Sequence, residues 1–413
     1  MNKVHLLNRA RQSAQQLSAK QVGGVSESGV DEHKAITDLQ CSLSEAYCGD
    51  DIELMAKTEG MPDGTKASAR IDVDGQPIAI LRGEGGQQIL LNWHVKDVEF
   101  RGEPLPEKKQ ARIAFAAGGE LKTVEPDVSL MRIPDKKDQP LDLVCQNEHF
   151  RWRSRLLVEW REKTLFVHLH LQARSAWLGR WLQFDPGLDH RADWVWVQKS
   201  HGRWCFWNQG SPRGWTPLPR PIGQYTVYHK IFVQSAGEFV CRDDPNLKWP
   251  EPFQDTGAWQ QAMQHWQQAI TNAWDGRFVM RRKGCQSSIS DCCSWPLRII
   301  VHWHKSADGE ATDTIPVDMV DSEDWERFNL RDWYIHARNS RLAAHHAGHL
   351  LGAWDEYESG AISPVNRTLT AETLMGIEFG AVEARHLAQL RERIREMINA
   401  WVGRAWEFDL SKR

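Results

Sequence analysis

Alternating apolar and polar residues dominate the chain between residues 40 and 133. The alternation recurs in short segments separated by turn signals, among them Asp-Gly pairs at 63–64 and 74–75. Such alternation is typical of half-buried strands, and an Asp-Gly pair favours a tight reversal. The segments expected to form strands are 51–55, 67–73, 77–81, 89–93 and 111–115. Their spacing predicts an Ig-like β-sandwich over residues 39–133, after a flexible leader at 1–38.

A second β-rich segment follows the charged, proline-bounded stretch 133–140, which is predicted to be a linker. Residues 165–171 alternate strictly, so their apolar side chains share one face. We predict a Trp-rich β domain over residues 134–255. An aromatic core is favoured over an exposed carbohydrate platform, because Trp is buried more often than it binds ligands. The tryptophans here include Trp152, Trp160, Trp177, Trp181, Trp194, Trp196, Trp204, Trp207 and Trp215.

Helical periodicity replaces the alternation after residue 255. Apolar residues at 259, 262, 263, 266 and 270 share one face of a predicted helix. Two further helices are expected near 338–351 and 381–401, with a strand through 297–303. This mixture predicts an α+β domain over residues 256–413. The expected fold is therefore multidomain, with two β-sandwich-like modules followed by an α+β domain.

Composition and charge narrow the classes of function. The 413 residues carry a net charge of −4, without the basic excess that is usual in nucleic-acid-binding proteins. No stretch approaches the roughly 20 apolar residues of a membrane span. The N-terminus lacks the apolar core of a secretory signal, so synthesis in the cytoplasm without a signal peptide is expected.

The strongest chemical signal is a histidine-rich helix followed by acidic residues. His345 and His349 lie four residues apart, so both imidazoles lie on one helix face and can reach one ion. Gly352 can adopt a positive φ and end the helix, which lets Asp355 return as a third ligand. Three protein ligands and an open fourth position are typical of catalytic zinc. Two alternatives are open. In one, His346 pairs with His349 in place of His345, and in the other Glu356 is the third ligand in place of Asp355.

This spacing resembles the metzincin pattern H-E-x-x-H-x-x-G-x-x-H/D at every position but one. Met375, about twenty residues further on in Leu-Met-Gly, is a candidate for the metzincin Met-turn. The segments 355–357, 374–376, 385–386 and 274–285 resemble a zinc-metallopeptidase-like family associated with bacterial type VI secretion. Its members are spike-protein extensions or stand-alone cargo. Residues 48–54 and 60–65 resemble that family more loosely.

The resemblance implies a function and its partners. It implies zinc held by His345, His349 and Asp355 above Met375, in a metzincin-like domain over residues 256–413. The expected activity is hydrolysis of amide bonds in a protein or peptide substrate by zinc-activated water. The implied partners are a secretion spike or tip protein and an immunity protein, and the implied route of export is type VI secretion.

One position departs from the metzincin pattern. The catalytic glutamate should follow the first histidine, but His346 stands there. His346 is one candidate base, because imidazole titrates near neutrality. Glu356 is the second candidate. The third outcome is loss of hydrolysis with metal binding kept, which describes a zinc-binding adaptor that docks on a secretion spike or partner protein.

Two further histidine pairs lie on predicted strands. His168 and His170 share one strand face, as do His302 and His304. An H-x-H pair on a strand can bind metal, but neither pair has a third ligand nearby in the sequence. Hydrogen-bonded or solvated histidines are therefore favoured at both places.

Overall fold

The computed structural model describes residues 34–96, 106–183, 194–200, 202–208, 214–235, 238–249, 258–285, 293–305, 314–322, 328–336, 340–370, 372–377 and 380–413. Strands dominate these residues, which form two compact units. Most of the predicted leader lies outside them, but its end belongs to strand β1 (Ala35–Cys41). No helix in the described part of the chain has the length and apolar character needed to cross a membrane.

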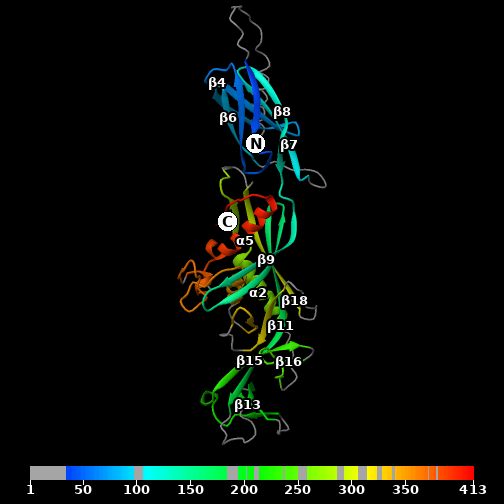
Figure 1. Cartoon of the computed structure of the whole chain (residues 1–413). Helices are drawn as coiled ribbons and strands as arrows, with labels where there is room; N and C mark the ends of the chain where they lie inside the picture. The colour runs from blue at the N-terminus through cyan, green and yellow to red at the C-terminus, as the bar shows by residue number, and fades with distance from the viewer. Residues whose placement is uncertain are drawn as a thin grey trace, which may run out of the picture. The chain divides into compact units, whose positions relative to one another are not determined.

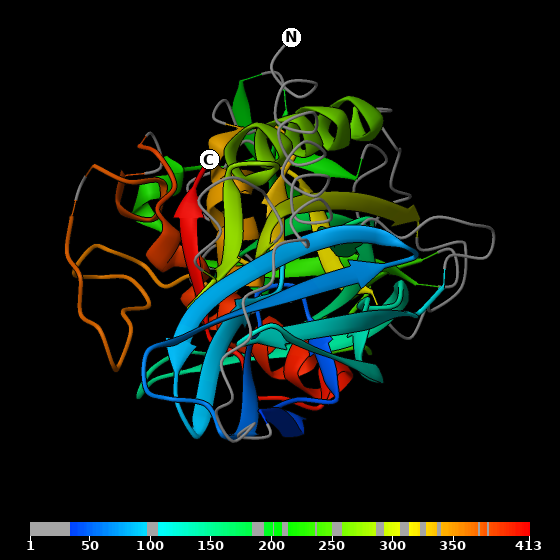
Figure 2. The same ribbon diagram turned by 90° about the horizontal axis from the view of Figure 1, so that it is seen from above.

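The first unit contains most of residues 34–128 and is built from two groups of strands, blue and cyan in Figure 2. β1, β3 and β6 form one sheet, while β5, β4, β7 and β8 lie side by side in another. Alternate residues are buried along β3 and β4, so each sheet has one apolar face. All five predicted strand segments lie in these strands. Their bounds are β3 Asp51–Glu59, β4 Thr65–Val73, β5 Gln76–Gly85, β6 Gln88–His94, β7 Lys108–Ala117 and β8 Glu120–Met131.

The first unit differs from the predicted module 39–133 because it is not continuous in sequence. Residues 45–51 and the described parts of 94–109 belong to the second unit. There, β2 (Glu45–Tyr47) pairs in parallel with Ser129–Met131. Pairing between strands that are far apart in the chain decides this division, and local alternation carries no information about it.

The second unit is organised around one long strand, β11 (Thr164–Gln183). β11 pairs with β10, β12 and β15 in antiparallel fashion, and with β18 and β19 in parallel (Figure 1). The strands of this large sheet are β9 Lys136–Gln146, β10 Arg151–Arg161, β12 Trp194–Ser200, β13 Arg203–Trp207, β14 Trp215–Pro217, β15 Val227–Ser235, β16 Glu238–Cys241, β17 Phe278–Arg282, β18 Ser294–Lys305, β19 Ile315–Asp321, β20 Asp332–Tyr334 and β21 Phe408–Lys412.

One face of the first half of β11 lies in the core. Leu165, Val167, Leu169 and Leu171 are all fully buried, in a cluster that also contains residues of α2, α3 and α5. The three predicted helices are present, although the last begins later than expected. The helices are η1 Ile222–Gln224, α2 Trp259–Trp274, α3 Arg341–Leu350, α4 Leu374–Ile377, η5 Ala384–Leu387 and α5 Ala388–Val402.

The structure does not divide the chain at the predicted boundary between 255 and 256. β11 belongs to the predicted Trp-rich domain and β18 to the predicted α+β domain, yet they pair along Leu165–Ala173. Residues 129–413 therefore form one unit within the described ranges. The predicted linker at 133–140 also differs, because Gln139 and Pro140 lie in β9. Proline is tolerated there because, within the part of the chain that the structure describes, β9 pairs with β10 alone and is an edge strand.

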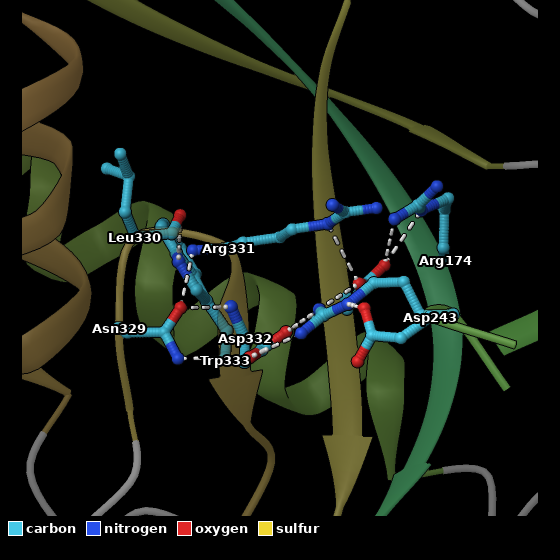
Figure 3. Close-up of polar contacts among 9 residues, drawn as sticks. Arg174, Asp243, Asn329, Leu330, Arg331, Asp332 and Trp333 are labelled. Carbon is cyan, nitrogen blue, oxygen red and sulfur yellow. Dashed lines mark hydrogen bonds and ion pairs between the residues drawn. The ribbon is translucent and has the colours of Figure 1, made fainter. Parts of the chain in front are cut away.

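A buried ion-pair network ties these two predicted domains together. Asp318 of β19 is fully buried and accepts hydrogen bonds from Arg174 Nε at 2.8 Å, Arg242 Nη1 at 2.9 Å and Arg331 Nε at 3.1 Å. Figure 3 shows Arg331 and Arg174 entering this set of polar contacts from opposite sides. Arg242 also binds Asp332 of β20. Since Arg174 and Arg242 precede residue 255, long-range charge pairing joins segments that local patterns separate.

The tryptophans of the β-rich segment pack against one another. Trp196 lies 4.3 Å from Trp181 and 4.8 Å from Trp249 between ring centroids, in a cluster that includes Phe232. Among the described residues, the large apolar side chains that are exposed include no tryptophan. This arrangement agrees with an aromatic core rather than a solvent-facing carbohydrate platform.

Candidate metal centre

Helix α3 presents two buried imidazoles from successive turns. His345 and His349 retain 1% and 6% of their exposure. Gly352 ends the helical turn with a φ of +92°, a conformation that favours glycine. Its N–H donates to the carbonyl oxygen of His349 at 2.9 Å. The reversal that follows returns Asp355 to the same pair of imidazoles.

Three ligand atoms converge at this point. Asp355 Oδ1 lies 3.1 Å from His345 Nε2 and 3.3 Å from His349 Nε2. His345 Nδ1 lies 2.9 Å from the carbonyl oxygen of Leu374, and His349 Nδ1 lies 3.0 Å from that of Ala353. A carbonyl oxygen only accepts, so each Nδ1 carries the hydrogen and each Nε2 presents a lone pair. Hydrogen bonding of this kind orients metal-binding histidines.

The arrangement fits a divalent cation. Asp355 Oδ1 is buried and has no hydrogen-bond partner among the described residues. Three lone-pair atoms facing one another repel unless a cation lies between them. Two ligands about 2.0–2.1 Å from a tetrahedral zinc are about 3.3 Å apart, close to the observed separations.

Backbone groups fix the carboxylate of Asp355. The N–H of Ala361 donates to Asp355 Oδ2 at 2.6 Å, which leaves Oδ1 directed at the imidazoles. Gly360 is a further requirement that sequence reasoning missed. A Cβ at this position would lie 2.5 Å from Asp355 Cβ, so only glycine fits without movement. The Gly-Ala step gives no local signal of this role, because the approach depends on how the loop closes.

Met375 lies against α3, the helix that carries His345 and His349. Its side chain is fully buried, and a Cβ added to Gly348 would lie 2.6 Å from Met375 Sδ. Gly348 lies directly before His349, so the thioether packs beneath the turn that joins the two histidines. Trp274 lies on the same side, and its Nε1–H donates to the carbonyl oxygen of Ala344 at 2.8 Å.

His346 lies beside the three converging atoms but makes different contacts. Its ring stacks on Phe328 with 5.3 Å between centroids and 14° between planes. A nitrogen of His346 lies within 4.8 Å of ligand nitrogens of His345 and His349. Its Nδ1 is buried and has no hydrogen-bond partner among the described residues. Burial and the neighbouring imidazoles hold the pKa of His346 well below its usual value, so the ring is neutral at pH 7.

Glu356 is not brought to the three converging atoms. Arg385 Nε donates to its Oε1 at 2.7 Å, Thr373 Oγ1 donates to its Oε2, and His386 Nε2 lies 3.2 Å from Oε1. The structure thus differs from the expectations of Glu356 as base or third ligand. Its oxygens instead bind Thr373, two residues before Met375, and two residues of η5, a role decided by contacts with residues up to 30 positions away in the chain.

Trp152 of β10 completes the surroundings of His349. Its Nε1–H donates to the carbonyl oxygen of His349 at 2.8 Å, and its ring lies 5.3 Å from the imidazole. The sequence singled out Trp152 only as one member of a tryptophan-rich segment.

A scan against models of known protein families finds no match to this chain, and a search of curated proteins also finds none.

Proposed function

We propose that the chain is a zinc-dependent hydrolase of the metallopeptidase type. The observation that carries the proposal is the convergence of His345 Nε2, His349 Nε2 and Asp355 Oδ1 on one point in a buried site. Each of the three side chains is held by a backbone group through its other polar atom. A set of two imidazoles and one carboxylate suits zinc.

In the proposed amide hydrolysis, the ion and the side chains of the protein have different roles. Zinc, when bound, would polarise an amide carbonyl and lower the pKa of a water molecule. His345, His349 and Asp355 would hold it, and Met375 would support the turn between the histidines. In the sequence, His346 stands where a metallopeptidase has the glutamate that accepts and returns a proton. Its neutral imidazole can accept a proton, but its lowered pKa makes it a weak base. We therefore expect slow turnover, with a deficit of about 10²–10⁴ in rate.

The proposed biological setting rests on the motifs of the sequence. The segments at 274–285, 355–357 and 374–376 resemble a metzincin-like family associated with type VI secretion. On that basis we propose a bacterial effector or cargo that acts on a protein or peptide. It would be carried by a spike or tip protein and neutralised in the producing cell by an immunity protein.

A non-catalytic zinc-binding adaptor is the second candidate. Two observations favour it over an active enzyme: the carboxylate of Glu356 is occupied by Arg385, and the ring of His346 is stacked on Phe328. In that case zinc would stabilise the fold around α3, and the β-rich parts of the chain would bind the spike.

Metal analysis combined with a cleavage assay separates these functions. The purified chain, His346→Glu and the control His265→Ala, altered at an exposed position of α2, would be compared on unfolded protein and peptidoglycan peptides. Cleavage by the native chain, increased in His346→Glu, supports a hydrolase with an altered base. Zinc binding without cleavage by either chain supports the adaptor. Failure of the native chain to bind zinc, or an unchanged metal content in His345→Ala, overturns both.

A further inference from the structure

Four histidines line one face of the large sheet, opposite the core. β11 and β18 run in parallel, with His170 beside His302 in register. The leucines at 165, 169 and 171 face the core, so the alternation of the strand turns His168 and His170 to the other face. His302 and His304 occupy the same face of β18. The two H-x-H pairs, which are 134 residues apart in the chain, thus form one cluster.

The imidazoles of this cluster are in direct contact. His168 Nδ1 lies 2.9 Å from His302 Nε2, and His170 Nδ1 lies 2.8 Å from His304 Nε2. The rings of His170 and His302 stack with 4.5 Å between centroids and 18° between planes. Neither H-x-H pair has a third candidate ligand nearby in the sequence. The pairing of β11 with β18 supplies one, because the other pair lies on the neighbouring strand.

We propose that His168, His170 and His302 form a second metal site, which binds a transition-metal ion of the class preferred by imidazole: Zn²⁺, Ni²⁺ or Cu²⁺. Ligand nitrogens of these three side chains all lie within 4.8 Å of one another. A metal at about 2.1 Å from each nitrogen requires closer spacing, which rotation of the rings about their side-chain bonds can provide. The ion would replace the N–H···N contacts between the rings by bonds to nitrogen lone pairs. His304 would not bind the ion itself, and would keep its contact with Nδ1 of the metal-bound His170 ring.

The charge state of the cluster suits a metal. Burial and the three neighbouring imidazoles lower the pKa of His170 to about 4, and burial and two neighbours also lower the pKa of His302. His170 and His302 are therefore neutral at pH 7, and each has one ring nitrogen with a free lone pair. Glu159 Oε2 lies 3.5 Å from His168 Nε2 and supplies a negative charge beside the cluster. Carboxylates that hydrogen-bond to metal-binding imidazoles orient them, and Glu159 is the carboxylate nearest to this role.

This site is independent of the one on α3. It shares no residue with that site, and it lies on a different element. The side chain of His168 retains 17% of its exposure, whereas that of His345 retains 1%. An ion can therefore reach the sheet without rearrangement of the core. The inference stands whether or not the chain hydrolyses amides.

Zinc titration of the metal-free full-length chain tests the inference. We expect about two equivalents in the native chain and about one in the double variant His170→Gln/His302→Gln, with a circular dichroism spectrum like that of the native chain. The double variant His345→Ala/His349→Ala should also bind about one equivalent, now on the sheet. His265→Ala is the matched control and should behave as the native chain does.

Copper spectroscopy gives a second readout, taken first on a protein in which the four histidines of the sheet are unchanged. Cu²⁺ added to His345→Ala/His349→Ala should give an electron paramagnetic resonance spectrum split by several imidazole nitrogens. Loss of this splitting after His302→Gln supports the site. If the cluster is only a hydrogen-bonded ladder, zinc stoichiometry will be the same with and without His170 and His302, and the nitrogen splitting will be absent. Either result overturns the inference.

Discussion

His345 donates its Nδ1 hydrogen to the carbonyl oxygen of Leu374, the residue directly before Met375, at 2.9 Å. This bond joins the first histidine of α3 to the turn that packs beneath the same helix. Glu356 strengthens the connection, because its N–H donates to the carbonyl oxygen of Met375 at 2.9 Å. The orientation of a candidate ligand and the position of the methionine turn are therefore coupled, and changes in one should be measurable at the other.

Asp355→Asn should change zinc affinity and stability in opposite directions. The amide keeps the shape of the side chain but removes the charge, so zinc should bind at least about tenfold more weakly. In the metal-free protein, the amide N–H₂ can donate to the lone pairs of His345 and His349. This should raise the free energy of unfolding by about 1 kcal/mol. Urea denaturation with and without a chelator measures both effects, and equal changes in the two conditions would contradict the metal site.

Met375→Ala should destabilise the protein by about 2–5 kcal/mol, because the side chain is fully buried against Gly348. Met375→Leu nearly conserves volume and should cost less than about 1.5 kcal/mol. Zinc affinity should fall with Met375→Ala but stay close to native with Met375→Leu. Chemical denaturation and zinc titration check the two parts. Unchanged zinc affinity in a folded Met375→Ala protein would show that the turn does not position the ligands.

Asp318→Ala should cost about 3–5 kcal/mol, because it leaves the partly buried guanidinium group of Arg174 without its carboxylate and leaves Arg242 with Asp332 alone. Asp142→Ala is the control, since its pair with Arg153 at 2.9 Å is partly exposed and should contribute no more than about 1 kcal/mol. The comparison uses the midpoint of denaturation of the full chain. Similar losses for the two variants would argue against a structural role for the buried network.

The pair of His94 and Asp51 should make stability depend on pH. Burial lowers the pKa of His94, but the carboxylate of Asp51 at 2.7 Å and Cys285 outweigh this and raise it above its usual value. The protonated imidazole therefore contributes stability that is fully present below about pH 6.5 and is lost as pH rises through the raised pKa. His94→Gln should cost up to about 1 kcal/mol at low pH and less at high pH. The difference should vanish in Asp51→Asn.

Much of the local structure was predictable from the chain because it depends on short-range periodicity. The apolar positions from 259 to 270 predict helix α2, and strict alternation predicts the first half of β11. The spacing of His345, His349, Gly352 and Asp355 is local as well, so one helix and one glycine predict that they can meet. Closure of the loop also requires Gly360, which the spacing does not reveal. The prediction for Glu356 had no such support, since its partner Arg385 lies 29 residues away.

The sequence by itself determined five strands of the first unit, the main helices and a set of three residues suited to one metal ion, but not β1 or β8. Only the tertiary structure decided that β11 joins β18 and β19 in one sheet, that Glu356 pairs with Arg385, and that four histidines share one face. The physical reason is the range of the interactions. Helix and strand periodicity acts over a few residues, whereas strand pairing and buried charge pairing join residues that have no fixed separation along the chain.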